Sequence, residues 1–322
     1  MNILENNYDL NLNILIRCDS SNIIGTGHVM RCLNLCEYYP NHKFTFVCRN
    51  FNYNITNKII DSNHKLILLE YNIEPELNNY KSWIGCDYKK EIDDLEKIII
   101  NNKYDQIIID HYGIDHTIEY EIKKIINKLI IINEVYDYKH YCDEYINYNS
   151  DELELVKSIN LNENTIYKIG IDYLILNKKF INKKKNNFNK EIKKICIMMG
   201  GSDPQNYTLK LIKEINNFII EKNIFVYIIF GKSNINEESI INFINNENYK
   251  ILRDLDYEEL INIYNIVDLC IGSLSVTAYE RLYLNVPQIC LKIVENQNIQ
   301  QLEQFNICNL NNIINKIHKY IY

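Results

Sequence analysis

The residues best suited to acid–base chemistry lie in the stretch SNIIGTGHVMRC. It gathers Gly25, Gly27, His28 and Arg31 in a chain of 322 residues that has only 9 glycines and 7 histidines. We expect a helix to begin at about His28, where the helix dipole disfavours a protonated imidazole and leaves the ring able to accept a proton. Arg31 lies on the same helical face. His28 is therefore a candidate general base, and the alternative is a purely structural residue at a helix start.

A second polar group is the sequence DHYG, which follows an apolar run. Asp110, His111 and Tyr112 stand there at the expected carboxyl end of a strand, the edge beyond which parallel sheets bind ligands. The loop after the first expected strand brings Asp19 to the same edge. These side chains indicate a substrate cleft; the alternative is that backbone partners satisfy His111 and Tyr112 internally.

Two glycine loops in the second half of the chain are candidates for binding an anion. The first reads MMGGSDPQN, in which a strand runs into Gly200, Gly201 and Ser202. We expect the next helix to start with Asp203 as N-cap and Pro204 as its first residue. Its free amides and positive end would then seat a phosphate. The loop matches neither the Walker pattern nor G-x-G-x-x-G, and simple turn punctuation is the alternative.

The second loop reads IGSLSVTAYERL and repeats the design. Gly272 is followed by Ser273 and Ser275, and then by a helix that carries Glu280 in its early turns. A carboxylate at this place can accept hydrogen bonds from a ribose diol. The alternative is that Glu280 pairs with a lysine or interacts with the helix N-terminus.

Composition argues against several classes of function. Hydrophobic residues make up 47% and charged residues 24% of the chain, as in ordinary globular proteins, and the net charge of −7 argues against a nucleic-acid-binding protein. No apolar run approaches the length of a membrane span, and the first residues show no secretory signal pattern, so we expect a cytoplasmic protein that does not bind membranes. Neither the 10 cysteines nor the 7 histidines show metal-ligand spacing. This predicts reduced thiols, no metal and no cofactor.

The elements that must position these residues alternate between short apolar runs and longer amphipathic ones. The apolar runs are continuous, as in parallel strands covered on both faces, and their alternation with helices predicts a doubly wound α/β fold. Expected strands cover residues 13–16, 43–48, 66–69, 106–109, 129–132, 144–148, 194–198, 225–230, 249–252, 269–271 and 288–291. Expected helices include 28–39, 115–128, 207–217, 257–265 and 276–284.

The length of the chain predicts two domains. Residues 176–194 are rich in lysine and asparagine and lack a regular hydrophobic period, so they read as a solvated linker with the boundary near residue 185. We expect residues 1–185 to form one Rossmann-like domain that carries His28. Residues 186–322 form the second, and the last helix packs either there or back on the first domain.

The sequence is similar to one known family. The stretches RCDSSNIIGTGHVMRCLNLC, IIIDHYGI, ICIMMGGSDPQNYTLK and IGSLSVTAYERLYLNVPQICLKIVENQ occur in the family's order. They resemble the UDP-2,4-diacetamido-2,4,6-trideoxy-β-L-altropyranose hydrolases of pseudaminic acid biosynthesis, over residues 12–300. G-x-G-H-x-x-R together with D-H-Y-G is specific to these enzymes, whereas G-G-S-D-P and E-N-Q alone indicate the broader sugar-nucleotide group. The resemblance implies a MurG-like GT-B fold with a cleft between two Rossmann-like domains, and a metal-free hydrolysis at the anomeric carbon that releases UDP with inversion.

The resemblance also implies roles for individual residues. His28 matches the base for the attacking water, and Tyr112 matches a tyrosine close to the reacting sugar. Glu280 and the two glycine loops match the UDP site, which makes 186–322 the UDP-binding domain. Asn296, in E-N-Q, matches a polar residue that lies near the phosphates or the sugar, and we count it with the catalytic residues. Its neighbour Gln297 is expected to contact the substrate. The chain departs from the family where an acidic pair is common and Asn133-Glu134 stands instead.

The expected partner is therefore a UDP-sugar, bound by a chain for which we favour a monomer. Two other functions stay open. A UDP-sugar glycosyltransferase of the same fold would favour an apolar or basic patch for a lipid acceptor, and the sequence shows no clear one. A non-catalytic sugar-nucleotide-binding subunit would need the loops of the second domain but not His28, Arg31 and Tyr112.

Overall fold

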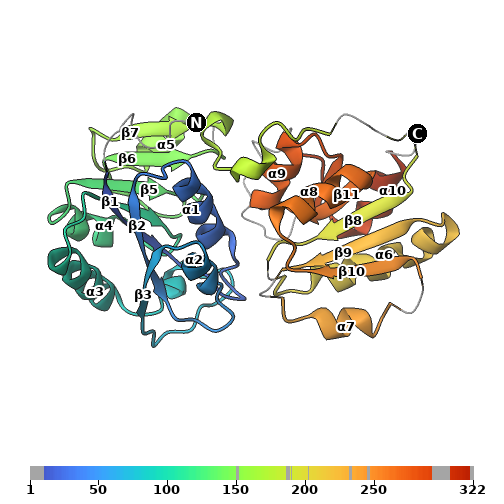
Figure 1. Cartoon of the computed structure of the whole chain (residues 1–322), viewed down its shortest axis with the longest axis horizontal. Coiled ribbons are helices and arrows are strands. Elements are labelled where there is room, and N and C mark those ends of the chain that lie inside the picture. Colours follow the sequence, from blue (N-terminus) through green and yellow to red (C-terminus); the bar gives the residue numbers. More distant parts are fainter. Residues whose placement is uncertain are drawn as a thin grey trace. The chain divides into compact units, whose positions relative to one another are not determined.

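The computed structural model describes residues 11–149, 152–185, 189, 191–201, 203–231, 234–244, 247–291 and 305–319. The chain divides into two compact units (Figure 1). Unit 1 comprises the residues up to Ile24 and from His28 to Ile175, and unit 2 comprises Gly25–Gly27 and the residues from Leu176 onward. Each unit has a parallel sheet of its own.

Unit 1 contains a seven-stranded sheet in the order β3-β2-β1-β4-β5-β6-β7, and all strand pairings in its described residues are parallel. The strands are β1 (Asn13–Cys18), β2 (Lys43–Arg49), β3 (Lys65–Leu69), β4 (Gln106–Asp110), β5 (Lys128–Ile132), β6 (Glu144–Asn147) and β7 (Ile166–Ile169). The helices are α1 (Gly27–Glu37), α2 (Asn57–Asp61), α3 (Tyr88–Asn101), α4 (His116–Lys123) and α5 (Leu153–Ser158), with 3₁₀ segments η1 (Tyr80–Ile84) and η2 (Ile171–Tyr173).

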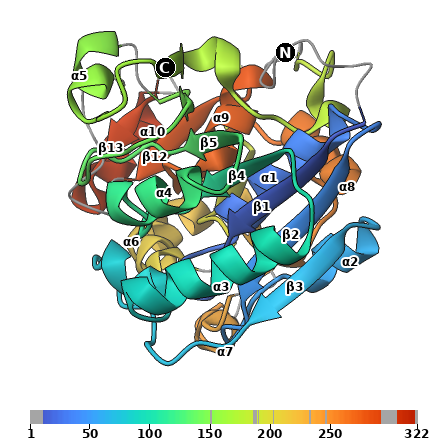
Figure 2. The same ribbon diagram turned by 90° about the vertical axis from the view of Figure 1, so that its left-hand side faces the viewer.

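The strands of unit 1 are apolar on both faces because helices cover both. Ile14 and Ile16 of β1 enter the core shared with α1 and α2, whereas Leu15 enters the core formed with α3, α4 and α5. Figure 2 shows α3 and α4 side by side over the second face. This double burial explains the continuous apolar runs in the sequence.

Unit 2 contains a six-stranded parallel sheet in the order β10-β9-β8-β11-β12-β13. Its strands are β8 (Lys194–Met198), β9 (Phe225–Phe230), β10 (Tyr249–Arg253), β11 (Leu269–Ser273), β12 (Gln288–Leu291) and β13 (Ile307–Cys308). Its helices are α6 (Tyr207–Glu221), α7 (Glu237–Ile241), α8 (Tyr257–Ile266), α9 (Val276–Tyr283) and α10 (Ile313–His318), with 3₁₀ segments η3 (Lys178–Phe180) and η5 (Leu310–Asn312). α6 and α10 pack on one core of this sheet, and α8 packs on the other.

The predicted doubly wound α/β fold is confirmed, and the order of the strands reverses beside the first strand of each sheet. Each predicted strand is present, and its ends shift by at most two residues. The sequence pattern does not indicate β7 or β13, because β7 is a partly exposed edge strand and β13 has only 2 residues. The described end of the chain belongs to unit 2, since Ile313 and Ile317 of α10 are buried in its core.

The expectation that residues 176–194 form a solvated linker is wrong for their first half. Phe180 is fully buried and its ring meets that of Tyr257 edge to face. The backbone amide of Lys185 donates to the carbonyl of Leu284 at 2.7 Å. These contacts attach the segment to unit 2, so the division falls before the predicted boundary near residue 185.

Candidate functional site

The polar residues predicted in unit 1 meet where the strand order reverses. β1 and β4 are neighbours, and Cys18 lies beside Asp110 in their register. His28 lies in the first turn of α1, after the loop that leaves β1, and Gly25 in this loop has a positive φ of 85°. The carboxyl ends of strands at such a reversal are where open α/β sheets bind ligands.

Asp110, the last residue of β4, holds both His28 and Arg31. One carboxylate oxygen lies 2.6 Å from Nδ1 of His28 and accepts from Nη2 of Arg31 at 2.6 Å. The other oxygen accepts from Nε of Arg31 at 2.7 Å. Asp110 is 0% exposed, Arg31 2% and His28 5%. With both oxygens engaged and no exposed surface, Asp110 can orient the histidine but has no oxygen left for a substrate.

The charges of this group decide its protonation states. Burial on its own would raise the pKa of Asp110, but Arg31 and His28 outweigh it and hold the pKa well below the usual range. Burial lowers the pKa of His28; Asp110 offsets part of this effect and Arg31 adds to it. His28 is therefore neutral near pH 7, and Asp110 is a carboxylate.

These states define the tautomer of His28. Because the carboxylate of Asp110 can only accept, Nδ1 of His28 carries the hydrogen and Nε2 has the free lone pair. Among the described residues, no group hydrogen-bonds to Nε2. A carboxylate that orients a histidine in this way leaves Nε2 able to take a proton from water and stabilises the imidazolium that results.

Tyr112 stands against the same imidazole. Its ring meets that of His28 edge to face, with centroids 4.5 Å apart. Trp83, in η1, stacks near Tyr112 at 6.0 Å, and Tyr80 meets both rings edge to face. Burial raises the pKa of Tyr112, although Arg31 opposes the shift, so its hydroxyl remains a donor.

His111 and Asp19 form a separate pair behind this group. Nδ1 of His111 accepts from the amide of Gly113 at 3.1 Å, so Nε2 carries the hydrogen and donates to Asp19 at 3.1 Å. Asp19 also forms an ion pair with Arg17 at 2.7 Å and accepts from the amide of Arg49 at 2.6 Å. Asp19 is 0% exposed and His111 3%. Both were expected among substrate-binding residues, and their contacts instead support the internal alternative in which they shape the loop that carries Tyr112.

Two further partners of Arg31 were not among the predicted site residues. Glu134, after β5, pairs with Nη1 of Arg31, and the hydroxyl of Tyr148, after β6, accepts from the same nitrogen at 2.5 Å. The signal that could have found them is their position, since each is a polar residue just beyond the carboxyl end of a parallel strand. Glu134 follows β5, which neighbours β4, and Tyr148 follows β6, which neighbours β5.

In unit 2, the prediction that α6 offers free amides to a phosphate is wrong. The helix begins at Tyr207 with Asn206 as its N-cap, later than the predicted start at Pro204. The carboxylate of Asp203 accepts from the amides of Tyr207 at 2.7 Å and Thr208 at 2.9 Å, and Asn206 accepts from that of Leu209 at 3.3 Å. A negative charge therefore already occupies this helix end. Gly200 and Gly201 remain beside it, and Gly200 has a positive φ of 86°.

The start of α9 has the opposite character. Ser275 is its N-cap but its side chain does not cap the helix, and the first turn carries no acidic residue. The hydroxyls of Ser273, Ser275 and Thr277 instead bond to one another, at 3.2 Å and 2.9 Å. With no side-chain cap, with hydroxyl groups and with no carboxylate in its first turn, this helix end can accept an anion.

Glu280 lies one turn further along α9. It is 4% exposed, and its Oε2 has no hydrogen-bond partner among the described residues. Burial raises the pKa of Glu280 to about 7, and the neighbouring Arg281 opposes the shift. The predicted pairing of Glu280 with a lysine is absent from the described ion pairs, so this carboxyl group is available to a ligand with hydroxyl donors.

Some predicted residues lie outside the described part of the chain, namely Ser202, Asn296 and Gln297. Within that part, no group of three or more His, Cys, Asp or Glu residues is arranged to hold a metal ion. All ten cysteines are buried free thiols. No helix of the described residues is long and apolar enough to span a membrane.

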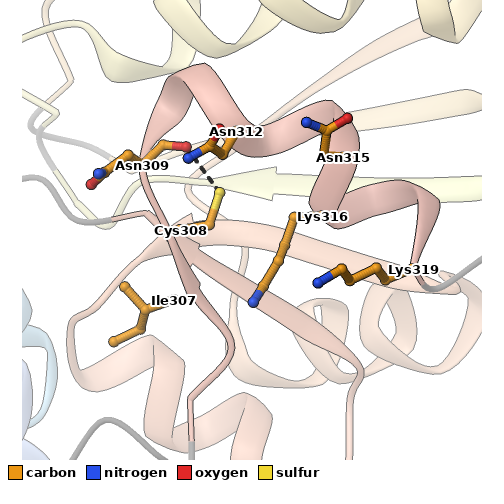
Figure 3. A pocket seen from close by; sticks show the side chains of 7 residues that line it. All are labelled: Ile307, Cys308, Asn309, Asn312, Asn315, Lys316 and Lys319. Carbon is orange, nitrogen blue, oxygen red and sulfur yellow. Dashed lines mark hydrogen bonds between the residues drawn. The ribbon is translucent and has the colours of Figure 1, made fainter.

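A groove of about 440 Å³ is lined by residues between Ile307 and Lys319, near the C-terminus. Figure 3 shows that Lys316 comes from α10 and that Lys319 directly follows this helix, whereas Ile307 and Cys308 come from β13. The thiol of Cys308 donates to the carbonyl of Asn309 at 2.9 Å. This groove contains none of the predicted site residues.

Comparisons with known proteins agree with this arrangement at the level of the fold. No family model matches the chain. The chain is 29% identical to an uncharacterised protein of Methanocaldococcus jannaschii over 87% of its own length, and it spans only 55% of that protein. It is 27% identical to UDP-2,4-diacetamido-2,4,6-trideoxy-beta-L-altropyranose hydrolase of Campylobacter jejuni, over 89% of this chain and 93% of that one.

Among solved structures, MurG of Acinetobacter baumannii matches with a TM-score of 0.56 at 11% identity, over 96% of this chain and 90% of that chain. Glycosyltransferases match in the same way. The chain therefore has the two-domain α/β architecture of the GT-B glycosyltransferases, as predicted.

Proposed function

We propose that this protein hydrolyses a UDP-linked 2,4-diacetamido-2,4,6-trideoxy sugar at its anomeric carbon. The observation that carries the proposal is the neutral His28, whose Nδ1 is held by buried Asp110 and whose Nε2 has no partner among the described residues. A protein that only bound a nucleotide would have no need of such a base. The similarity to the C. jejuni hydrolase supports the substrate class.

The reaction on this proposal needs one base and one anion site. Nε2 of His28 takes a proton from water while the water oxygen bonds to the anomeric carbon from the face opposite UDP. The bond between that carbon and the β-phosphate oxygen breaks, and UDP leaves with the electron pair, so the configuration inverts. Asp110 stabilises the imidazolium, which then gives its proton to solvent.

The leaving group explains why a second carboxylic acid is unnecessary. Glycosidases that expel alcohols use two carboxyl groups. UDP is a far better leaving group once donors stabilise the charge on its phosphates. We assign this stabilisation to the start of α9 with Ser273 and Ser275, and the ribose to Glu280. Tyr112, Asn296 and Gln297 are proposed to lie near the sugar or the phosphates.

The direct test is to incubate the purified protein with candidate UDP-diacetamido sugars and follow UDP and free sugar by NMR. We expect the first-formed sugar to have inverted anomeric configuration. His28→Asn should lower kcat by about 10² to 10⁴, because general-base assistance is lost. Its affinity for UDP, measured by calorimetry, should stay that of the wild type.

Other outcomes identify the alternatives. UDP release only when an acceptor alcohol is added would make the protein a glycosyltransferase, which the shared GT-B architecture allows. UDP binding without turnover of any sugar would make it a binding subunit. Near-normal turnover of His28→Asn would remove His28 as the base.

A further inference from the structure

A buried arginine lies directly behind the proposed phosphate site of unit 2. Arg281, in α9, is 0% exposed. Its Nε donates to Oε1 of Gln288 at 2.8 Å, and its Nη2 donates to the carbonyl of Ser273 at 3.4 Å. The guanidinium lies over Gly272, where an added Cβ would come within 3.2 Å of Nη2 and 2.2 Å of the carbonyl of Met198. Only glycine leaves room for this arrangement.

This guanidinium forms no ion pair within the described part of the chain, and its one electrostatic neighbour there with a carboxyl group is Glu280, whose pKa is raised by burial. The groups that it contacts there are a side-chain amide, a hydroxyl and a backbone carbonyl, all neutral. The buried arginines of unit 1 differ, since Arg17, Arg31 and Arg49 each pair with a carboxylate. Burying a charge is costly unless an opposite charge compensates it. An anionic ligand close by would supply that compensation.

Hydroxyl groups connect Arg281 to the surface of the loop. Nη1 of Arg281 donates to Oγ1 of Thr277 at 3.3 Å, and this oxygen shares a hydrogen bond of 2.9 Å with Oγ of Ser275 in which either oxygen can be the donor. Ser273 donates to Oγ of Ser275 at 3.2 Å. When Thr277 is the donor, Ser275 accepts two hydrogen bonds and keeps its own proton to donate. It is half-buried and lies beside Gly200, in the loop of the proposed phosphate site.

We infer that Arg281 is a positioning residue for the diphosphate, resting on the proposed function of unit 2 as the UDP site. It does not touch the ligand. Its charge raises the potential at the start of α9, and its hydrogen bond to Thr277 orients the hydroxyls so that Ser275 donates to a phosphate oxygen. Both effects act on the ligand's negative charge and leave the uracil and ribose contacts unchanged. Arg281 therefore makes unit 2 selective for a nucleoside diphosphate over the nucleoside.

The test measures binding of UDP, UMP and uridine to the full chain by calorimetry. Arg281→Met should weaken UDP binding roughly tenfold, because a unit charge acts strongly on another over about 10 Å at an effective dielectric constant of about 20. The loss should be smaller for UMP and absent for uridine. Arg281→Lys should retain most of the UDP affinity. A role limited to packing would lower the melting temperature and leave the ratio of UDP to uridine affinity unchanged.

Lys185→Met is the matched control, because Lys185 is also a buried cation of unit 2 but its Nζ donates to the carbonyls of Tyr264 and Val267, before β11 begins. In Lys185→Met the ratio of UDP affinity to uridine affinity should equal that of the wild type.

Thr277→Val is a second variant that tests the same inference if Arg281→Met fails to fold. It keeps the shape of the side chain and breaks the hydroxyl connection, so it should reduce UDP affinity severalfold and spare uridine. An unchanged ratio in both Arg281→Met and Thr277→Val, or in Thr277→Val alone when the arginine variant does not fold, overturns the inference while the proposed function stands. A wild-type protein that does not bind UDP overturns both.

Discussion

His28 illustrates how a buried neighbour sets the chemistry of one side chain. Position at the start of α1 suggests a neutral imidazole, but the structure adds stronger reasons, namely burial and the charge of Arg31. Asp110 works in the other direction and keeps the shift from becoming larger. The result is a base whose pKa lies below the usual histidine value and whose tautomer is set by a hydrogen bond.

The pH dependence of the reaction should follow from this shift. A general base must be unprotonated, so kcat at saturating substrate, to which the binding role of Glu280 does not contribute, should rise with pH through the pKa of His28 and become level above it. Since that pKa is lowered from 6.5, the midpoint of the acidic limb should lie below pH 6.5. Steady-state rates of UDP release between pH 4.5 and pH 8, with protein stability checked at each pH, measure it. A midpoint above pH 6.5 would show that another group acts as the base.

Glu280 differs from His28 because burial favours its protonated form, whereas binding of ribose hydroxyls calls for the carboxylate. Burial raises its pKa to about 7, and Oε2 has no partner among the described residues. Two ribose hydroxyls would donate to the charged form and stabilise it. In the free protein the charged form of this carboxyl group is therefore unfavourable, and a bound ligand with hydroxyl donors would stabilise it.

The free energy of unfolding of the free protein should therefore depend on the ionisation of Glu280. Below pH 4.5 Glu280 is protonated in both the folded and the unfolded state, so it has no effect. Between pH 4.5 and about 7 the unfolded state loses its proton first, and folding stability therefore falls as pH rises. The difference reaches about 3 kcal/mol at most. Urea unfolding of the wild type and Glu280→Gln at pH 5 and pH 8 isolates it.

Glu280→Gln should gain free energy of unfolding relative to the wild type as pH rises, because its amide does not ionise. Equal pH dependence of the two proteins would mean that the carboxylate is already solvated in the free protein.

Two helices that follow neighbouring strands of unit 2 have differently capped N-termini. α6 follows β8 and α9 follows β11, and these strands are neighbours at the reversal of the sheet. Asp203 and Asn206 occupy the amides at the start of α6, whereas no side chain caps α9. A helix end that already holds a carboxylate does not attract a phosphate, so the two ends respond differently to the loss of one polar group.

A pair of substitutions separates these two roles. Asp203→Ala should reduce the free energy of unfolding by about 1 kcal/mol, the usual loss for a capping residue, and leave UDP affinity unchanged. Ser275→Ala should do the reverse: little loss of stability and about tenfold weaker UDP binding, because it removes a hydrogen bond to a charged acceptor. Calorimetry and urea unfolding of both variants provide the comparison. Weaker UDP binding in Asp203→Ala would return the phosphate site to α6.

The whole molecule repeats one design in two units with different side chains. Both sheets are parallel and both reverse their order beside the first strand. Unit 1 fills its strand ends with a histidine, two carboxylates and buried arginines, while unit 2 fills its own with glycines and hydroxyls. The proposed base and the proposed nucleotide site thus come from the same fold used twice.

The complete reaction should proceed without a metal ion. On the proposed mechanism, amides, hydroxyls and Arg281 meet the charge of the phosphates, so EDTA should leave the rate of UDP release unchanged. The control is the same assay with added magnesium or manganese after dialysis. Activity that EDTA abolishes and a divalent cation restores would contradict the mechanism and require ligands from the chain or the substrate.

The sequence by itself determined the elements and the edge at which the chemistry lies. Short continuous apolar runs that alternate with amphipathic segments indicate strands buried on both faces, and glycine or polar residues directly after them indicate a binding edge. His28, Arg31 and Asp110 were all found on this basis, because local order along the chain places each at a strand or helix end. The boundaries of short edge strands were not, since β13 has no pattern longer than 2 residues.

Only the tertiary structure decided which of these residues contact one another. Asp110 lies 82 positions from His28, and no local pattern states that one carboxylate holds both the histidine and Arg31. The cap of α6 depends on how the chain turns through Asp203, and the isolation of Arg281 depends on which side chains surround it. Periodicity reports burial and local conformation, whereas hydrogen-bond partners and pKa values depend on distances between segments that the fold brings together.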